Sequence, residues 1–193
     1  MPPKVKITKE DIVNTAIDLI QNGEELNARD IALKLNCSTQ PIFSNFKTMD
    51  DLKLDVLKKC AEIYDEFTKS EIEKNEYPIY KILGMAYIQF AKEEKELFKI
   101  LFMGKRENED VGSNSFDNGA KLVQKLLNLS NEDAKIFQLE MWSFVHGIAV
   151  MHATGFLEIE KPLISRMLSD NFNGLKTQFT GKDKSYIWLK LKN

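Results

Sequence analysis

Residues 27–52, NARDIALKLNCSTQPIFSNFKTMDDL, decide the fold that this sequence predicts. Asn27 is a typical cap of a short helix, and Asn36 suits the tight turn after it because asparagine tolerates the left-handed conformation. A second short helix is expected from Ser38, its predicted cap, to about Asn45. Two short helices joined by such a turn form a helix-turn-helix, which DNA-binding proteins lay against the major groove.

The second short helix has one apolar side and one small, polar side. Ile42 and Phe46 form the side expected to be buried, and the opposite side suits close approach to base edges and phosphates. No acidic residue occurs from Ile31 through Met49, although the chain has 29 acidic residues. A polyanionic partner requires such a local gap in negative charge.

The residues expected to contact DNA come from both short helices and the turns around them. They are Asn27, Arg29, Ser38, Thr39, Gln40, Pro41, Phe43, Ser44, Asn45 and Lys47. Thr39, Gln40 and Ser44 are the favoured base readers. Three lysines near the N-terminus are expected to add phosphate or minor-groove contacts: Lys4, Lys6 and Lys9. The competing interpretation is a plain helical hairpin whose polar side chains are only a solvated surface.

The rest of the chain also has helical periodicity, so the predicted fold class is all-α. Thr8 and Thr48 are expected to cap the first and fourth helices, each with an aspartate three residues later. Further helices are expected over residues 78–90, 120–128, 130–151 and 160–179, with a short apolar helix over 96–102. Residues 104–119 are expected to be mostly a mobile loop. The predicted domains are an N-terminal helix-turn-helix unit over 1–50, a larger helical body over 51–180 and a tail over 181–193.

Composition narrows the class of protein. The 193 residues have a formal net charge of -2, which excludes a protein coated in basic charge. Cys37 and Cys60 are far apart and neither lies in a C-x-x-C pair, so no disulfide framework or cysteine-based metal site is expected. His146 and His152 do not share one helix face, and no metal or cofactor is expected. No signal peptide, membrane span or catalytic motif occurs, so a cytoplasmic, non-enzymatic protein is expected.

Residues 8–57 resemble the DNA-binding domain of the TetR family of bacterial transcription regulators. The positions that carry the resemblance are Ala16, Gly23, Ile31-Ala32, Cys37-Ser38, Ile42-Phe43, Asn45-Phe46 and Leu52. Five positions depart from the family pattern: Asn36 replaces a glycine, Pro41 a small residue, Phe43 a hydroxyl-bearing aromatic, Asn45 a histidine and Met49 a lysine. These departures suggest a weaker hold on phosphate or an altered sequence preference, for which Lys47 is expected to compensate in part.

The second half contains a looser resemblance. Residues 141–149, MWSFVHGIA, are similar to a Trp…His-Gly signature of one group of TetR C-terminal domains. The resemblance implies that the last two long helices pair with those of a second subunit and that the body holds an effector pocket. Candidate pocket residues are Met85, Phe98, Phe102, Met103, Met141, Trp142 and His146. The competing interpretation of each of them is an ordinary core position.

The resulting prediction is a homodimeric transcription regulator that binds a palindromic double-stranded DNA operator. The resemblance implies a repressor that a small, apolar effector releases from the operator. Two alternatives stay open: a ligand-binding helical module that has lost DNA binding, and an enzyme built in a helical bundle. A steep salt dependence of duplex binding would exclude the first alternative, and turnover of a bound compound would favour the second.

Overall fold

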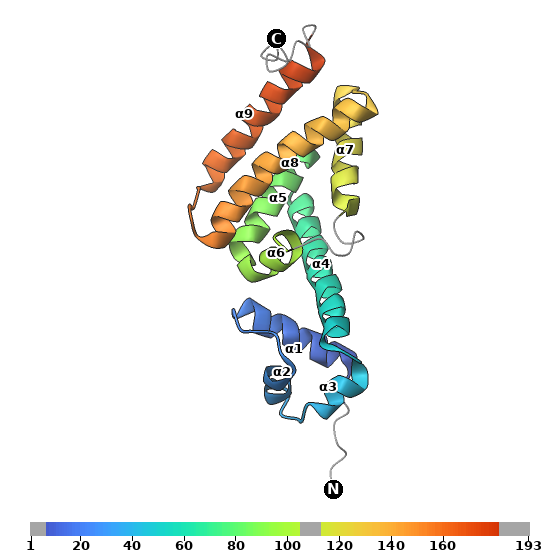
Figure 1. The fold of residues 1–193 in the computed structure, drawn as a ribbon. Coiled ribbons are helices and arrows are strands. Elements are labelled where there is room, and N and C mark those ends of the chain that lie inside the picture. The colour runs from blue at the N-terminus through green and yellow to red at the C-terminus, as the bar shows by residue number, and fades with distance from the viewer. Residues whose placement is uncertain (1–6, 105–112, 182–193) are drawn as a thin grey trace, which may run out of the picture.

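The structure, a computed structural model, describes residues 7–104 and 113–181 of the chain, with side chains described from residue 116 in the second range. All regular structure in these ranges is helical, which confirms the predicted fold class. The helices are α1 (Lys9–Gln21), α2 (Ala28–Lys34), α3 (Gln40–Asn45), α4 (Met49–Lys74), α5 (Ile79–Glu93), α6 (Lys95–Phe102), α7 (Ser113–Leu127), α8 (Asn131–Thr154) and α9 (Lys161–Thr180). Figure 1 shows α1–α3 as a small head, with α4 leading from it into a larger body.

Local signals set the ends of the head helices. Thr8 and Thr48 form the predicted capping boxes of α1 and α4, each accepting a hydrogen bond from the backbone of the aspartate three residues later. Such a cap contributes about 1 kcal/mol. Asn36 has φ of 49°, the left-handed conformation expected of the turn between α2 and α3.

The predicted cap of α3 is wrong by one residue. Thr39 occupies the N-cap position, and its side chain makes no capping hydrogen bond. Had Ser38 been the cap, Pro41 would have stood at the third helical position, where capping uses a backbone N–H that proline lacks. The helix instead begins at Gln40, and Pro41 stands within its first turn, where a missing N–H costs little.

Head and body share one apolar core. Ile12, Ile31 and Ile42 are fully buried between the three head helices, and Leu52 and Cys60 continue the same cluster along α4 toward α5 and α6. Fully burying such aliphatic side chains stabilises the fold by about 1.5–3 kcal/mol each. The division into domains at residue 50 stays a prediction, because α4 begins at Met49 and packs in both parts.

The body is built around α5 and α8, and α7 and α9 pack against this pair. The predicted loop over residues 104–119 is wrong for its second half, because α7 begins at Ser113; residues 105–112 lie outside the described ranges. A Cβ atom on Gly119 would lie 2.6 Å from the Gln138 amide nitrogen. This glycine therefore marks the close approach of α7 to α8 rather than a break in the chain.

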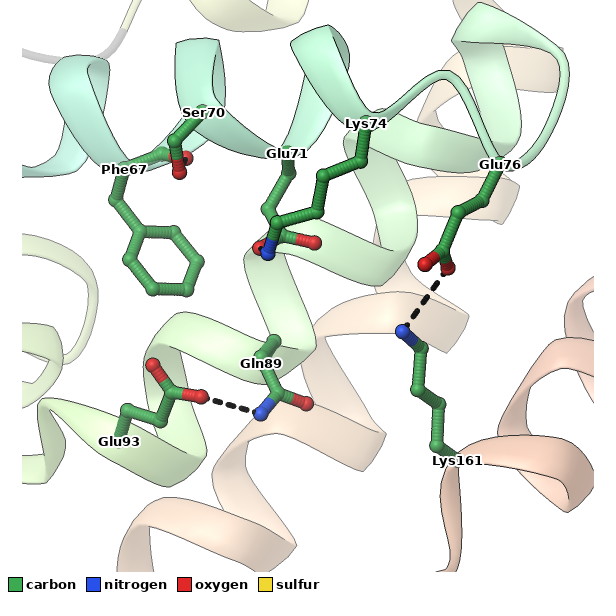
Figure 2. A network of polar contacts seen from close by, with 8 residues as sticks. All are labelled: Phe67, Ser70, Glu71, Lys74, Glu76, Gln89, Glu93 and Lys161. Atoms are coloured by element: carbon green, nitrogen blue, oxygen red, sulfur yellow. Dashed lines mark hydrogen bonds and ion pairs between the residues drawn. The ribbon is translucent and has the colours of Figure 1, made fainter.

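One exposed ion pair joins the segment just after α4 to the start of α9 (Figure 2). Lys161 at the start of α9 forms an ion pair with Glu76, 3.1 Å from nitrogen to oxygen, just after α4. Pairs of this kind contribute at most about 1 kcal/mol. The aromatic contact beside them matters more, since the rings of Phe67 and Phe90 meet edge to face with their centroids 5.4 Å apart.

Candidate nucleic-acid interface and ligand cavity

The polar face of α3 points away from the core. Ile42 and Phe46 anchor the helix with exposed fractions of 0% and 3%. The predicted contact residues that lie exposed in and around α3 are Ser38, Thr39, Gln40, Phe43, Ser44 and Lys47, and α2 adds the exposed Arg29. The Ser44 hydroxyl donates a 2.8 Å hydrogen bond to the Gln40 carbonyl, which leaves its oxygen free to accept. Gln40 and Ser44 therefore share one exposed surface, as base reading requires.

Two predicted contact residues have their amide groups engaged inside the chain. The Asn45 amide nitrogen donates to the Pro41 carbonyl at 2.8 Å. Asn27 caps α2, accepting from the Asp30 backbone at 2.9 Å, and its amide nitrogen donates to the Asp30 carboxylate at 2.6 Å. Both asparagines are half-buried. Their contact with DNA stays a prediction, and their first role here is to hold the two short helices in shape.

Positive charge near α3 is modest. Arg29 and Lys47 are exposed, and neither forms an ion pair within the part of the chain that the structure describes. Lys34 pairs with Glu24 at 3.3 Å, and Lys9 lies over the ring of Phe46, 4.8 Å from its centroid. The predicted contacts of Lys4 and Lys6 fall outside the described residues.

A cavity of about 530 Å³ lies inside the body. This volume is in the range of pockets that bury a drug-sized ligand. The aromatic and aliphatic side chains that form most of its wall are Tyr64, Pro78, Tyr80, Leu83, Tyr87, Phe102, Phe116, Leu126, Leu127, Met141, Trp142, Val145, Leu168 and Phe172. Its polar side chains are Asp65, Thr68, Lys81, Gln138, Ser169, Asn173 and Lys176, and Gly84 and Gly119 complete it.

Three of the predicted pocket residues line this cavity: Phe102, Met141 and Trp142. Met85 and Phe98 are instead buried in the core, and Met103 is exposed at the end of α6. His146 lies behind the wall, with its ring stacked on Trp142 at 4.7 Å and its Nδ1 2.9 Å from the Tyr87 hydroxyl. Core and cavity wall use the same apolar residue types, so sequence alone cannot separate them.

Polar groups in the wall were not found by sequence analysis. The Lys81 ammonium donates to the Ser169 hydroxyl at 2.8 Å, and the Tyr80 hydroxyl donates to the Gln138 carbonyl oxygen at 2.7 Å. Burial raises the pKa of Tyr64 to about 12, so its phenol stays protonated at neutral pH. Lys81 and Ser169 are 88 residues apart, and no local pattern joins them.

His152 ties the end of α8 to the connection before α9. Its ring is 1% exposed, and its Nε2 accepts a hydrogen bond from the Ile159 backbone N–H at 3.3 Å. Burial, followed by the positive charge of Lys92, lowers the pKa of His152 below the ordinary 6.5, although Glu158 opposes this shift. The neutral ring is therefore the folded form, because a protonated Nε2 has no lone pair to accept with.

This arrangement predicts a loss of stability in mild acid. Because the folded-state pKa is lowered, the stabilisation is present above the unfolded value near 6.5 and is lost as the pH falls through the folded value. The free energy of unfolding, measured by urea titration, is expected to decline between about pH 7 and pH 5. His152→Gln should flatten this decline, and His146→Gln measures the separate contribution of the other histidine, whose pKa burial also lowers. An unchanged slope in His152→Gln would contradict the assignment.

The geometry defines an all-helical protein with an N-terminal helix-turn-helix and a hollow helical body. It is similar in structure to a TetR-like transcriptional regulator from Rhodococcus sp. RHA1, with a TM-score of 0.66 and 17% sequence identity over 94% of this chain and 100% of that chain. It is also similar to a transcriptional regulator (TerR/AcrR family) from Aquifex aeolicus VF5, with a TM-score of 0.54 and 19% identity over 88% of this chain and 98% of that one.

The chain therefore has the TetR-like fold over nearly its whole length, as the sequence resemblance implied. Searches of protein-family models and of curated proteins find no match. Across the described ranges no helix is long and apolar enough to cross a membrane. The same residues contain no group of three histidine, cysteine, aspartate or glutamate side chains placed to hold a metal ion.

Proposed function

We propose that this chain is a DNA-binding transcriptional regulator that lays α3 in the major groove of a palindromic operator. The observation that carries the proposal is the exposed face of α3, where Gln40 and Ser44 lie clear of the core. Phe43 is 51% exposed on the same helix, and an aromatic side chain there suits apolar contact with a thymine methyl group. Arg29 and Lys47 supply contacts to phosphate.

The proposal includes a homodimer formed through α8 and α9. Each of these helices has a second stripe opposite its buried face: Ile136, Leu139, Ser143 and Gly147 on α8, and Leu163, Asp170 and Gly174 on α9. Leu139 and Leu163 are about half exposed, and a Cβ atom on either glycine would meet nothing within 4 Å. Apart from the acidic Asp170, these stripes combine apolar side chains with small residues, which favours close packing against a second copy, whose two-fold symmetry matches a palindrome.

The long helix α4 is the proposed connection between the cavity and the head. Its 26 residues span about 39 Å at the usual rise per residue. Leu52 and Val56 lie in the core shared with the head, whereas Tyr64 and Thr68 line the cavity. A ligand that displaces the second half of α4 would therefore tilt the head, and DNA and ligand would bind with opposed coupling. We propose that the regulator is a repressor, which its effector releases from the operator.

The experiment that tests DNA binding selects duplexes from sheared genomic DNA of the source organism at moderate salt. We expect enrichment of an inverted repeat with half-sites about one or more helical turns apart. Its affinity should fall steeply with salt, with log K changing by about 0.9 per phosphate contact for each tenfold change in salt. A folded dimer that enriches no sequence, with or without added ligand, would refute the proposal.

Two observations favour a second candidate, a ligand-binding module without DNA binding. The positive charge around α3 is small, and two of the amides expected to face DNA have partners inside the chain. Such a module would show weak duplex binding with little salt dependence, while still filling its cavity. The salt titration above therefore separates the two functions.

A further inference from the structure

Two residues that line the cavity, Lys81 on α5 and Lys176 on α9, are positively charged. Lys81 on α5 is half-buried, and its ammonium donates to Ser169 and lies 4.7 Å from the centroid of the Tyr77 ring. Within the described ranges it forms no ion pair with a carboxylate. An ammonium has three donors, and a half-buried charge is stabilised by an anionic partner. Lys81 therefore has a donor to spare at the cavity wall.

The partner of Lys81 is held in a fixed direction. Ser169 donates its own hydroxyl hydrogen to the Ser165 carbonyl at 3.1 Å, so its oxygen is the acceptor for Lys81. Asn173 and Lys176 follow Ser169 along the same face of α9, line the same cavity and are exposed. These positions place two ammonium groups and an amide on the α5 and α9 side of the cavity.

Most of the remaining cavity wall is apolar. Trp142, Val145 and Leu168 belong to its aromatic and aliphatic majority, and the acidic side chain among the described lining residues, Asp65, comes from α4 rather than from α5 or α9. A ligand that binds both the positively charged residues and the apolar wall has an anionic head and an apolar body.

We infer that the ligand of this cavity is an amphipathic carboxylate, whose head binds Lys81 and Ser169 while its hydrocarbon body lies against Trp142 and the apolar wall. The inference rests on the proposed function for its regulatory meaning, but ligand binding itself is tested separately. It differs from the small, apolar effector expected in the sequence analysis by having a charged head group.

Three probes with the same ten-carbon chain test the head group: decanoate, 1-decanol and decyltrimethylammonium, each used below its micelle concentration. Trp142 is the reporter, in a Trp188→Phe background that leaves it as the sole tryptophan of the two. We expect decanoate to quench its fluorescence with an affinity about tenfold or more above that of 1-decanol, since a hydrogen bond to a charged group is stronger than a neutral one. Decyltrimethylammonium should bind weakest.

Two variants assign that preference to the proposed residues. Lys81→Met should lower decanoate affinity about tenfold, to the level of the alcohol, without changing alcohol binding. Ser169→Ala should also lower decanoate affinity, but by less than Lys81→Met. This second variant keeps the inference testable if Lys81→Met does not fold. Lys69→Met is the control, because Lys69 is an exposed lysine on α4 outside the cavity lining.

Equal binding of decanoate and 1-decanol, no binding of any probe, or an unchanged preference in both variants would overturn the inference. A final arm adds decanoate to the operator complex. If decanoate binds in a Lys81-dependent way but leaves operator binding unchanged, the cavity inference holds and the proposed regulation fails. If operator binding is specific but decanoate does not bind, the proposed DNA binding holds and the cavity inference fails.

Discussion

Replacing Gln40 and Ser44 together with alanine is expected to weaken binding to the selected operator by roughly 100-fold, because each lost base contact costs about 1–3 kcal/mol. Both side chains are exposed, and among the described residues only the Ser44 side chain makes a hydrogen bond, to a carbonyl of its own helix. The melting temperature should therefore stay unchanged. Affinity is measured by fluorescence anisotropy of a labelled operator at fixed salt.

The control for this experiment is Ser70→Ala with Gln124→Ala. Ser70 also bonds a carbonyl of its own helix, at Phe67, and both residues lie in the body far along the chain from α3. This pair should leave operator affinity within about twofold of the original, as surface changes away from a site usually do. In Gln40→Ala with Ser44→Ala, the affinity for DNA of unrelated sequence should change little, because the contacts to phosphate are kept. Unchanged operator affinity in Gln40→Ala with Ser44→Ala would refute the base-reading role of this surface.

Gly147→Arg is expected to convert the proposed dimer into a monomer, raising the dimer dissociation constant roughly 100- to 1,000-fold. Nothing lies within 4 Å of a Cβ atom at this position, so the monomer has room for the new side chain. Arginine also favours the helix over glycine by about 0.8 kcal/mol. In a dimer through α8 and α9, the charge would be buried without a partner. Sedimentation velocity measures the change in mass.

Two control measurements separate loss of the dimer from unfolding and from the mere presence of an added arginine. Circular dichroism should show the same helix content in Gly147→Arg, which separates dissociation from unfolding. Ser70→Arg places the same side chain on the exposed part of α4 and should stay dimeric. Operator affinity should fall with the loss of the dimer, because a single head contacts only one half-site. A Gly147→Arg protein that remains a dimer would show that this stripe is not the interface.

Local sequence was sufficient for the helix-turn-helix. The caps at Thr8 and Thr48 and the left-handed Asn36 involve only a few neighbouring residues, so their physics is visible in the chain itself. The rows of apolar residues with helical spacing likewise predict which face of each helix is buried. The all-α class followed from these features, and the structure confirms it. The resemblance to the TetR family depended instead on residue types at particular positions within residues 8–57, and the structure has that fold.

Tertiary packing decided what the buried faces meet. Periodicity could not tell that Phe98 fills the core while Phe102, on the same short helix, reaches the cavity. Gly119 read locally as a breaker, yet it lies inside α7 where that helix approaches Gln138. Lys81 meets Ser169 only because α5 and α9 pack together, so the charge that we propose selects a ligand depends on two segments 88 residues apart.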